Sequence, residues 1–80
     1  MHYIYLIQSV KFPNKKYIGY TINLKERFNR HNRAGFKHTT RYRPWRLVAC
    51  LAFDDQDKAL AFERYLKSGA GRAFAKKRFW

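Results

Sequence analysis

The first segment of the chain, His2–Val10, restricts the fold more than any other feature of the sequence. It reads HYIYLIQSV and is rich in aromatic and branched residues, which favours a β-strand. Alternation along that strand places Tyr5 and Ile7 on one face and Ile4 and Leu6 on the other, so both faces are apolar. A strand with two apolar faces must be covered on both sides. We therefore expect it at the centre of a small sheet covered by helices.

A second strand and a helix follow. Residues 16–21 read KYIGYT, which resembles the first strand in composition and predicts a β-hairpin. Asn23 is suited to cap a helix, Glu26 lies three residues later as in a capping box, and Gly35 is a stop signal. These signals predict a helix over Leu24–Ala34.

The second half of the chain predicts four further segments. They are a basic loop over Gly35–Pro44, a third strand over Trp45–Phe53, a second helix from Asp54-Asp55 to about Ser68, and a basic tail over Arg72–Trp80. Gly69 and Gly71 would end the second helix. The order β-β-α-β-α predicts an α+β fold, a three-stranded antiparallel sheet flanked by helices. Eighty residues are too few for two self-sufficient cores, so we expect one domain over residues 1–80.

The charge of the chain is strongly positive. Lys and Arg number 18 and Asp and Glu number 5, which gives +13 at pH 7. Such a charge repels itself unless a polyanion neutralises it, as nucleic acid or an anionic membrane does. The longest uncharged apolar stretch, Leu47–Phe53, is far shorter than the ~20 residues that span a bilayer. Nucleic acid is therefore the expected partner, and without a basic and apolar leader we expect a cytoplasmic protein.

The single cysteine, Cys50, lies in an apolar run and has no partner for an internal disulfide. We expect a buried, inert thiol at this position. One Cys and three scattered His do not have the spacing of a zinc site.

Several motifs, taken in order, resemble those of one family. They are Tyr3-Ile4-Tyr5, Tyr17-Ile18-Gly19, Thr21-x-Asn23-Leu24-x-x-Arg27-Phe28-x-x-His31-Asn32 and, in the second helix, Glu63. This series resembles the GIY-YIG nuclease family, and residues 65–78 are similar to its small, stand-alone members. Two positions depart from the family pattern. Tyr3 stands where the family has a glycine, and no asparagine follows Asn32, although many members have one late in the module.

The resemblance implies a metal-dependent endonuclease that hydrolyses phosphodiester bonds in DNA. Glu63 would bind one Mg²⁺ or Mn²⁺, whose other ligands come from water and phosphate. Arg27 would hold the scissile phosphate, Tyr5 would act as general base and Tyr17 would position the water. A free phenol has a pKa of about 10, so Tyr5 needs positive charge nearby to act at neutral pH. His31, with an ordinary pKa of about 6.5, is a competing base.

The hairpin register provides a test of this site. Tyr5 and Tyr17 share a face only if odd positions pair with odd ones. A loop of about seven residues, Gln8–Asn14, would place Tyr5 nearly opposite Tyr17, and we predict this loose loop. Gly19 is expected to permit close packing between strand and helix rather than to take part in chemistry.

Basic and aromatic residues outside this site are typical of a surface that binds nucleic acid. The expected contacts are Lys37, Arg41, Tyr42, Arg43 and Arg46 in the loop and Arg72, Lys76, Lys77 and Arg78 in the tail. Trp45 begins a strand and is expected in the core. No segment resembles a recognition helix, so the structure of the substrate should matter more than its base sequence, with DNA favoured over RNA.

Each site residue also has a purely structural interpretation. Tyr5 and Tyr17 are common in sheets, His31 can be a hydrogen-bonded core residue, and Glu63 can pair with Arg64 or Lys67. The alternative hypothesis is therefore a basic DNA- or RNA-binding module of the same fold without catalysis. A module of this size is also expected to depend on a partner protein for targeting.

Overall fold

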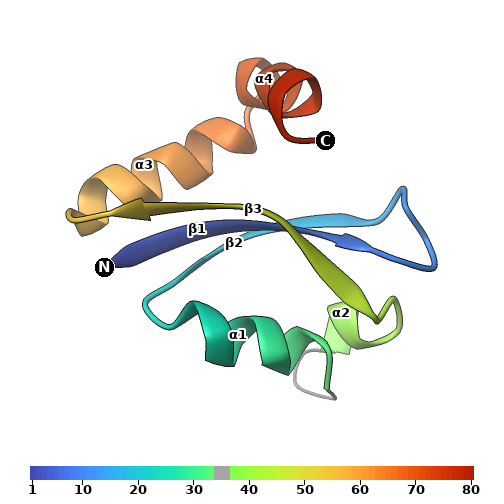
Figure 1. Ribbon diagram of the computed structural model, residues 1–80. Coiled ribbons are helices and arrows are strands. Elements are labelled where there is room, and N and C mark those ends of the chain that lie inside the picture. The colour runs from blue at the N-terminus through green and yellow to red at the C-terminus, as the bar shows by residue number, and fades with distance from the viewer. Residues whose placement is uncertain (34–36) are drawn as a thin grey trace.

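The computed structural model describes residues 1–33 and 37–80, with the side chains of Lys37 and His38 left out. Its elements in chain order are β1 (His2–Ser9), β2 (Lys16–Thr21), α1 (Leu24–His31), α2 (Lys37–Thr40), β3 (Trp45–Phe53), α3 (Gln56–Leu66) and α4 (Gly69–Arg78). The strands form one antiparallel sheet in the order β2-β1-β3. Helices α1 and α2 lie on one face of this sheet and α3 and α4 on the other (Figure 1). The predicted α+β class and the central position of the first strand are confirmed.

Strand β1 forms the core together with the helices on both faces. Its residues Ile4 to Ile7 have no exposed surface. Ile4 and Leu6 pack with Ala59 and Leu66 of α3 on one face of the sheet. Burying one such aliphatic side chain contributes about 1.5–3 kcal/mol to stability.

The second cluster lies on the face that α1 covers. Tyr5 and Ile7 of β1 are buried there with Trp45 at the start of β3, and Leu24 and Phe28 of α1 pack against them. The two α1 residues are four apart, so they lie on the same side of the helix, as the sequence predicts. The expected core position of Trp45 is confirmed, since its side chain is only 4% exposed.

An irregularity in β3 brings Trp45 to this face. The pairing of β1 with β3 shifts by one residue between Leu6, which faces Ala49, and Ile7, which faces Leu47. Because side chains alternate along a strand, such a bulge reverses the side on which the following residues point. The shift pairs Trp45 with Ser9, and so places the indole beside Ile7 and Tyr5.

The prediction of a buried thiol is wrong, because Cys50 is exposed. Cys50 pairs with Tyr5 and therefore points to the face that α1 covers. Strand β3 is at the edge of the sheet, and α1 packs over Tyr5, Ile7 and Tyr17 of β1 and β2 instead. The helix does not extend over Cys50.

Two helices stand where the sequence predicts a loop and a tail. Helix α2 lies inside the predicted basic loop, and α4 includes most of the predicted basic tail. Asn23 caps α1 as predicted, although α1 ends at His31, and the predicted stop at Gly35 lies outside the described residues. At the end of the chain, Phe79 and Trp80 pack against the core on the α3 side.

Helix α3 ends before the predicted glycine stop, and a new helix begins there. Asp55 caps α3, as predicted, but α3 ends at Leu66, and Ser68 then caps α4 by accepting from the backbone N–H of Gly71 at 3.2 Å. Gly71 is buried in the first turn of α4. A Cβ at Gly71 would overlap the carbonyl of Tyr65, so this glycine permits the close contact between the two helices.

A comparison of two glycines tests this contact. We expect Gly71→Ala to lower the free energy of unfolding by about 1–3 kcal/mol, because backbone atoms must move to make room. Gly69 is the control, since a Cβ there would have no neighbour within 4 Å. Gly69→Ala should leave stability unchanged or raise it by up to about 1 kcal/mol. Urea denaturation of both variants checks this, and equal midpoints would contradict it.

Candidate active site

A buried chain of hydrogen bonds lies between β1 and α1. The Tyr5 hydroxyl is 2.9 Å from Nε2 of His31, and Nδ1 of His31 is 2.9 Å from the hydroxyl of Thr39 in α2. All three side chains are at most 2% exposed. The Trp45 indole N–H donates to the Thr39 carbonyl at 2.8 Å, which fixes α2 against β3. Both ring nitrogens of His31 are therefore engaged, and the ring is held in one orientation.

Tyr17 joins this cluster from β2. The hairpin pairs Ile7 with Tyr17 and Tyr5 with Gly19, so odd positions pair with odd ones and the two tyrosines share a face, as predicted. The Tyr17 ring centroid is 6.1 Å from that of Tyr5 and 4.9 Å from that of His31. Tyr5 is not opposite Tyr17, however, because pairing continues to Gln8, which is opposite Lys16. The seven residues between the strands are therefore 9–15, one position later than predicted. Tyr17 is partly exposed, whereas Tyr5 is fully buried.

Gly19 provides the space for the Tyr5 phenol. A Cβ at position 19 would overlap the hydroxyl and the adjoining ring carbon of Tyr5. The expected close packing is therefore present, but its partner is the neighbouring strand and not a helix. Any larger residue at position 19 would displace Tyr5 from His31.

Burial raises the pKa of Tyr5 well above the ordinary value for a phenol. The neighbouring Tyr17 raises this pKa further, while a hydrogen bond and the positive charge of Arg27 lower it without cancelling the effect of burial. A phenolate at Tyr5 would need positive charge nearby. The charge is present, but Tyr5 is protonated at neutral pH.

Arg27 reaches the cluster from α1. It lies one helical turn before His31, so both side chains leave the same side of the helix. One guanidinium nitrogen donates to the Tyr20 carbonyl of β2 at 3.5 Å. The structure thus brings together four of the predicted residues, namely Tyr5, Tyr17, Arg27 and His31.

Glu63 approaches from the other face of the sheet. Its carboxylate is 3.2 Å from the Lys67 ammonium one turn later in α3, and its side chain is 18% exposed. This is one of the two ion pairs that the sequence allowed for Glu63. Lys67 lines a cavity together with Tyr17, so the two faces of the sheet meet at the β2 edge.

The single carboxylate of Glu63 suits a metal ion that retains water. Among the described residues, no group of three or more His, Cys, Asp or Glu side chains is placed to enclose an ion. A site with one carboxylate suits Mg²⁺, which usually keeps several waters and takes phosphate oxygens as further ligands. Glu63 fits that role if the incoming cation replaces the Lys67 ammonium.

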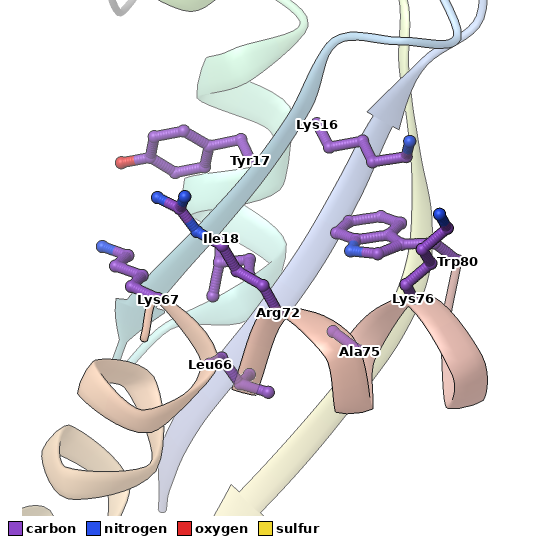
Figure 2. A pocket seen from close by; sticks show the side chains of 9 residues that line it. All are labelled: Lys16, Tyr17, Ile18, Leu66, Lys67, Arg72, Ala75, Lys76 and Trp80. Atoms are coloured by element: carbon purple, nitrogen blue, oxygen red, sulfur yellow. The ribbon is translucent and has the colours of Figure 1, made fainter. Parts of the chain in front are cut away.

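The cavity between β2, α3 and α4 includes residues that the sequence argument missed. It has a volume of about 530 Å³ and is lined by Lys16, Tyr17, Ile18, Leu66, Lys67, Arg72, Ala75, Lys76 and Trp80 (Figure 2). The position of Lys16 could have been predicted from the sequence. Side chains alternate along a strand, so Lys16 points to the face of the sheet opposite to that of Tyr17. The position of Trp80 had no such signal, because it depends on how α4 packs. The same holds for Thr39 beside His31, whose position depends on how α2 packs.

The other predicted nucleic-acid contacts divide into two regions. Arg72 and Lys76 line the cavity, whereas Lys77 and Arg78 lie elsewhere on α4.

The second region lies at the hairpin end of the sheet. The Tyr42 ring packs edge-on against Phe12 there, and Lys15 and Arg41 lie over the Tyr42 ring. The hydrogen bond from Arg41 is the main cause that lowers the pKa of Tyr42. Arg43 is exposed, Arg46 donates to the Gln8 side chain at 2.7 Å, and the Lys37 side chain lies outside the described part.

The sequence matches the family model described as the GIY-YIG catalytic domain over residues 1–77, and the chain belongs to this family. A structure-specific endonuclease subunit SLX1 homolog of Giardia intestinalis is 38% identical over 65 residues, which are 76% of this chain and 18% of that protein. A UPF0213 protein of Pediococcus pentosaceus is 39% identical over 66 residues, 81% of this chain and 67% of that protein. The chain thus spans less than a fifth of the Giardia relative.

A solved structure has the same fold. The solution NMR structure of a UPF0213 protein from Bacillus halodurans matches with a TM-score of 0.57 and 29% identity, covering 95% of this chain and 82% of that one. The predicted likeness to the small bacterial members of the family is confirmed. Within the described residues, the helices are too short and too polar to cross a membrane.

The raised pKa of Tyr5 predicts a pH effect on stability. The phenol ionises near pH 10 in the unfolded chain and only at higher pH in the folded protein. The stability that the protonated Tyr5 contributes to the folded protein is therefore fully present below about pH 10, and it is lost as the pH rises above that value. Denaturation curves should show the wild-type free energy of unfolding falling faster than that of Tyr5→Phe, by up to about 1.4 kcal/mol per pH unit. If the free energies of unfolding of the two proteins fell equally with pH above about pH 10, the raised pKa of Tyr5 would be contradicted.

Proposed function

We propose that this chain is a metal-dependent endonuclease that hydrolyses phosphodiester bonds in DNA. The observation that carries the proposal is the cluster of Tyr5, Tyr17, Arg27 and His31, drawn from three elements and joined by hydrogen bonds and ring contacts. Chance packing of aromatic residues does not require a guanidinium and an imidazole at the same phenol. Membership of the GIY-YIG family supports the same interpretation.

The burial of Tyr5 indicates how a proton would leave the attacking water. Tyr17 is the partly exposed phenol, so water meets it first, and the buried Tyr5 hydroxyl interacts both with Tyr17 and with Nε2 of His31. As the water oxygen bonds to phosphorus, its proton passes to Tyr17, the Tyr17 proton to Tyr5, and the Tyr5 proton to Nε2 of His31. The bond from phosphorus to the 3′ oxygen breaks in the same displacement. This relay requires no phenolate at rest, and it makes His31 the final acceptor.

Two further side chains would manage the charge of the phosphate. The guanidinium of Arg27 is always ionised and is planar, so it could donate hydrogen bonds to two oxygens of the scissile phosphate. Glu63 would hold the metal ion, either Mg²⁺ or Mn²⁺. That ion would stabilise negative charge on the phosphate and on the departing 3′ oxygen. Thr39 would keep the imidazole of His31 oriented by its hydrogen bond at Nδ1.

The charged surface supports a nucleic-acid substrate. A net charge of +13 favours salt-sensitive binding to phosphates, with DNA as the proposed substrate. The Giardia relative carries the name of a structure-specific endonuclease subunit, which supports selection by the structure of the substrate and dependence on a partner for targeting. We extend both properties to this chain as part of the proposal.

A pair of glutamates provides a controlled test of the metal site. Glu63 and Glu26 each pair with a cation one turn later on a helix, but Glu26 lies on α1 with Arg30. We expect Glu63→Gln to lower the rate of nicking of supercoiled plasmid by about 10²-fold or more in Mn²⁺ or Mg²⁺, because the cation loses its carboxylate. Glu26→Gln should cut at the wild-type rate, and both variants should still bind DNA.

The controls distinguish a nuclease from a non-catalytic module that only binds nucleic acid. Chelator should stop cleavage by the wild type. Equal nicking by wild-type and Glu63→Gln preparations would contradict the proposal and indicate a contaminating nuclease. Salt-sensitive binding without cleavage of supercoiled, single-stranded or branched DNA would instead assign the chain to the non-catalytic binding class.

A further inference from the structure

The cavity between β2, α3 and α4 is built from cations and apolar surface. Its charged lining consists of Lys16, Lys67, Arg72 and Lys76, and the described residues that line it include no acid. Lys67 is partly neutralised by Glu63, at 3.2 Å, but Lys16, Arg72 and Lys76 still give the cavity a positive potential that an anion would relieve. Its volume of about 530 Å³ is within the range of roughly 300–1,000 Å³ usual for sites that hold one small group.

An indole lies on one side of these cations. Trp80 packs against the core on the α3 side and lines the cavity with Ile18 and Ala75. The Lys16 ammonium lies over the Trp80 ring, 5.6 Å from its centroid. Lys16 is exposed and its side chain is long, so the ammonium can leave the ring for an anion while a flat group takes its place on the indole. Figure 2 shows Trp80 beside Lys16 and Lys76, with Arg72 extending toward Tyr17.

Tyr17 connects the cavity to the proposed active site. Its side chain lines the cavity, and its ring also contacts Tyr5 and His31. A group bound in the cavity is therefore adjacent to the position proposed for the scissile phosphate. Cations near Tyr17 and an aromatic face beyond them match the order of phosphate and base within one nucleotide.

We infer that this cavity holds one unpaired nucleotide of a nucleic-acid strand, with its base on Trp80 and its phosphate at Arg72, Lys76 and Lys67. The inference rests on the proposed function for the position of the cut, but the binding site stands on its own lining. A base within a duplex cannot reach the indole without leaving its stack, which costs free energy. The preferred substrates are accordingly single strands, flaps and junctions that offer an unpaired nucleotide beside the cleaved bond.

Two neighbouring lysines of α4 provide the matched variants. Lys76 lines the cavity and Lys77 does not, although both are exposed. Binding is measured in chelator, so that no cleavage occurs, by fluorescence anisotropy of a labelled single strand of about ten nucleotides. Lys76→Gln should weaken binding of this strand about tenfold more than Lys77→Gln does. Both should weaken binding of a blunt duplex equally, since only general phosphate attraction acts there.

Tryptophan fluorescence tests the contact with the base. Binding of the single strand should quench the wild-type emission, and Trp80→Leu should abolish the quenching while the buried Trp45 still emits. The Trp80→Leu variant should also bind the strand about tenfold more weakly. The comparison of Lys76 with Lys77 remains informative if Trp80→Leu fails to fold.

Three results would overturn the inference. One is equal weakening by Lys76→Gln and Lys77→Gln with no quenching by the strand. Another is competition by adenosine monophosphate as strong as that by the strand, which would assign the cavity to a free nucleotide. The third is equal competition by polyglutamate, which would assign it to an acidic protein. Failure of plasmid cleavage alone would contradict the proposed function and leave this binding result unaffected.

Discussion

Burial of both faces of β1 is the constraint on which the rest of the structure depends. Ile4 to Ile7 have no exposed surface, so one face of the sheet needs α1 and the other needs α3 and α4. With β1 at the centre, β2 becomes an edge. Side chains from the helices on opposite faces can then meet only around an edge of the sheet, and β2 carries Tyr17 there. The position of the proposed site follows from this arrangement.

The same burial determines the chemistry of the cluster. Enclosure raises the pKa of Tyr5, so this phenol is a hydrogen-bonded intermediary and not a ready base. Gly19 makes the enclosure possible, and His31 satisfies the buried hydroxyl. The interactions that stabilise the core therefore also orient the groups proposed to move a proton.

Much of this arrangement is predictable from local rules. Strand alternation, combined with the predicted seven-residue loop, predicts that Tyr5 and Tyr17 share a face, and helical spacing places Arg27 beside His31. The remainder depends on tertiary packing that has no local signal. The four residues of α2 show no periodicity, so the bond from Thr39 to His31 could not be predicted. The exposure of Cys50 depends on how far α1 extends across the sheet, and the cavity depends on the packing of α4 against β2.

The convergence of Glu63 with the tyrosine cluster is the central claim, and Mn²⁺ titration followed by NMR tests it most directly. Bound Mn²⁺ broadens signals of nearby residues, and Mg²⁺ is the control without broadening. The account predicts broadening centred on Glu63 that extends to Tyr17 and His31 across the β2 edge. Broadening centred on Asp54, Asp55 and Asp57 at the start of α3, with sharp signals for Tyr17, would contradict it.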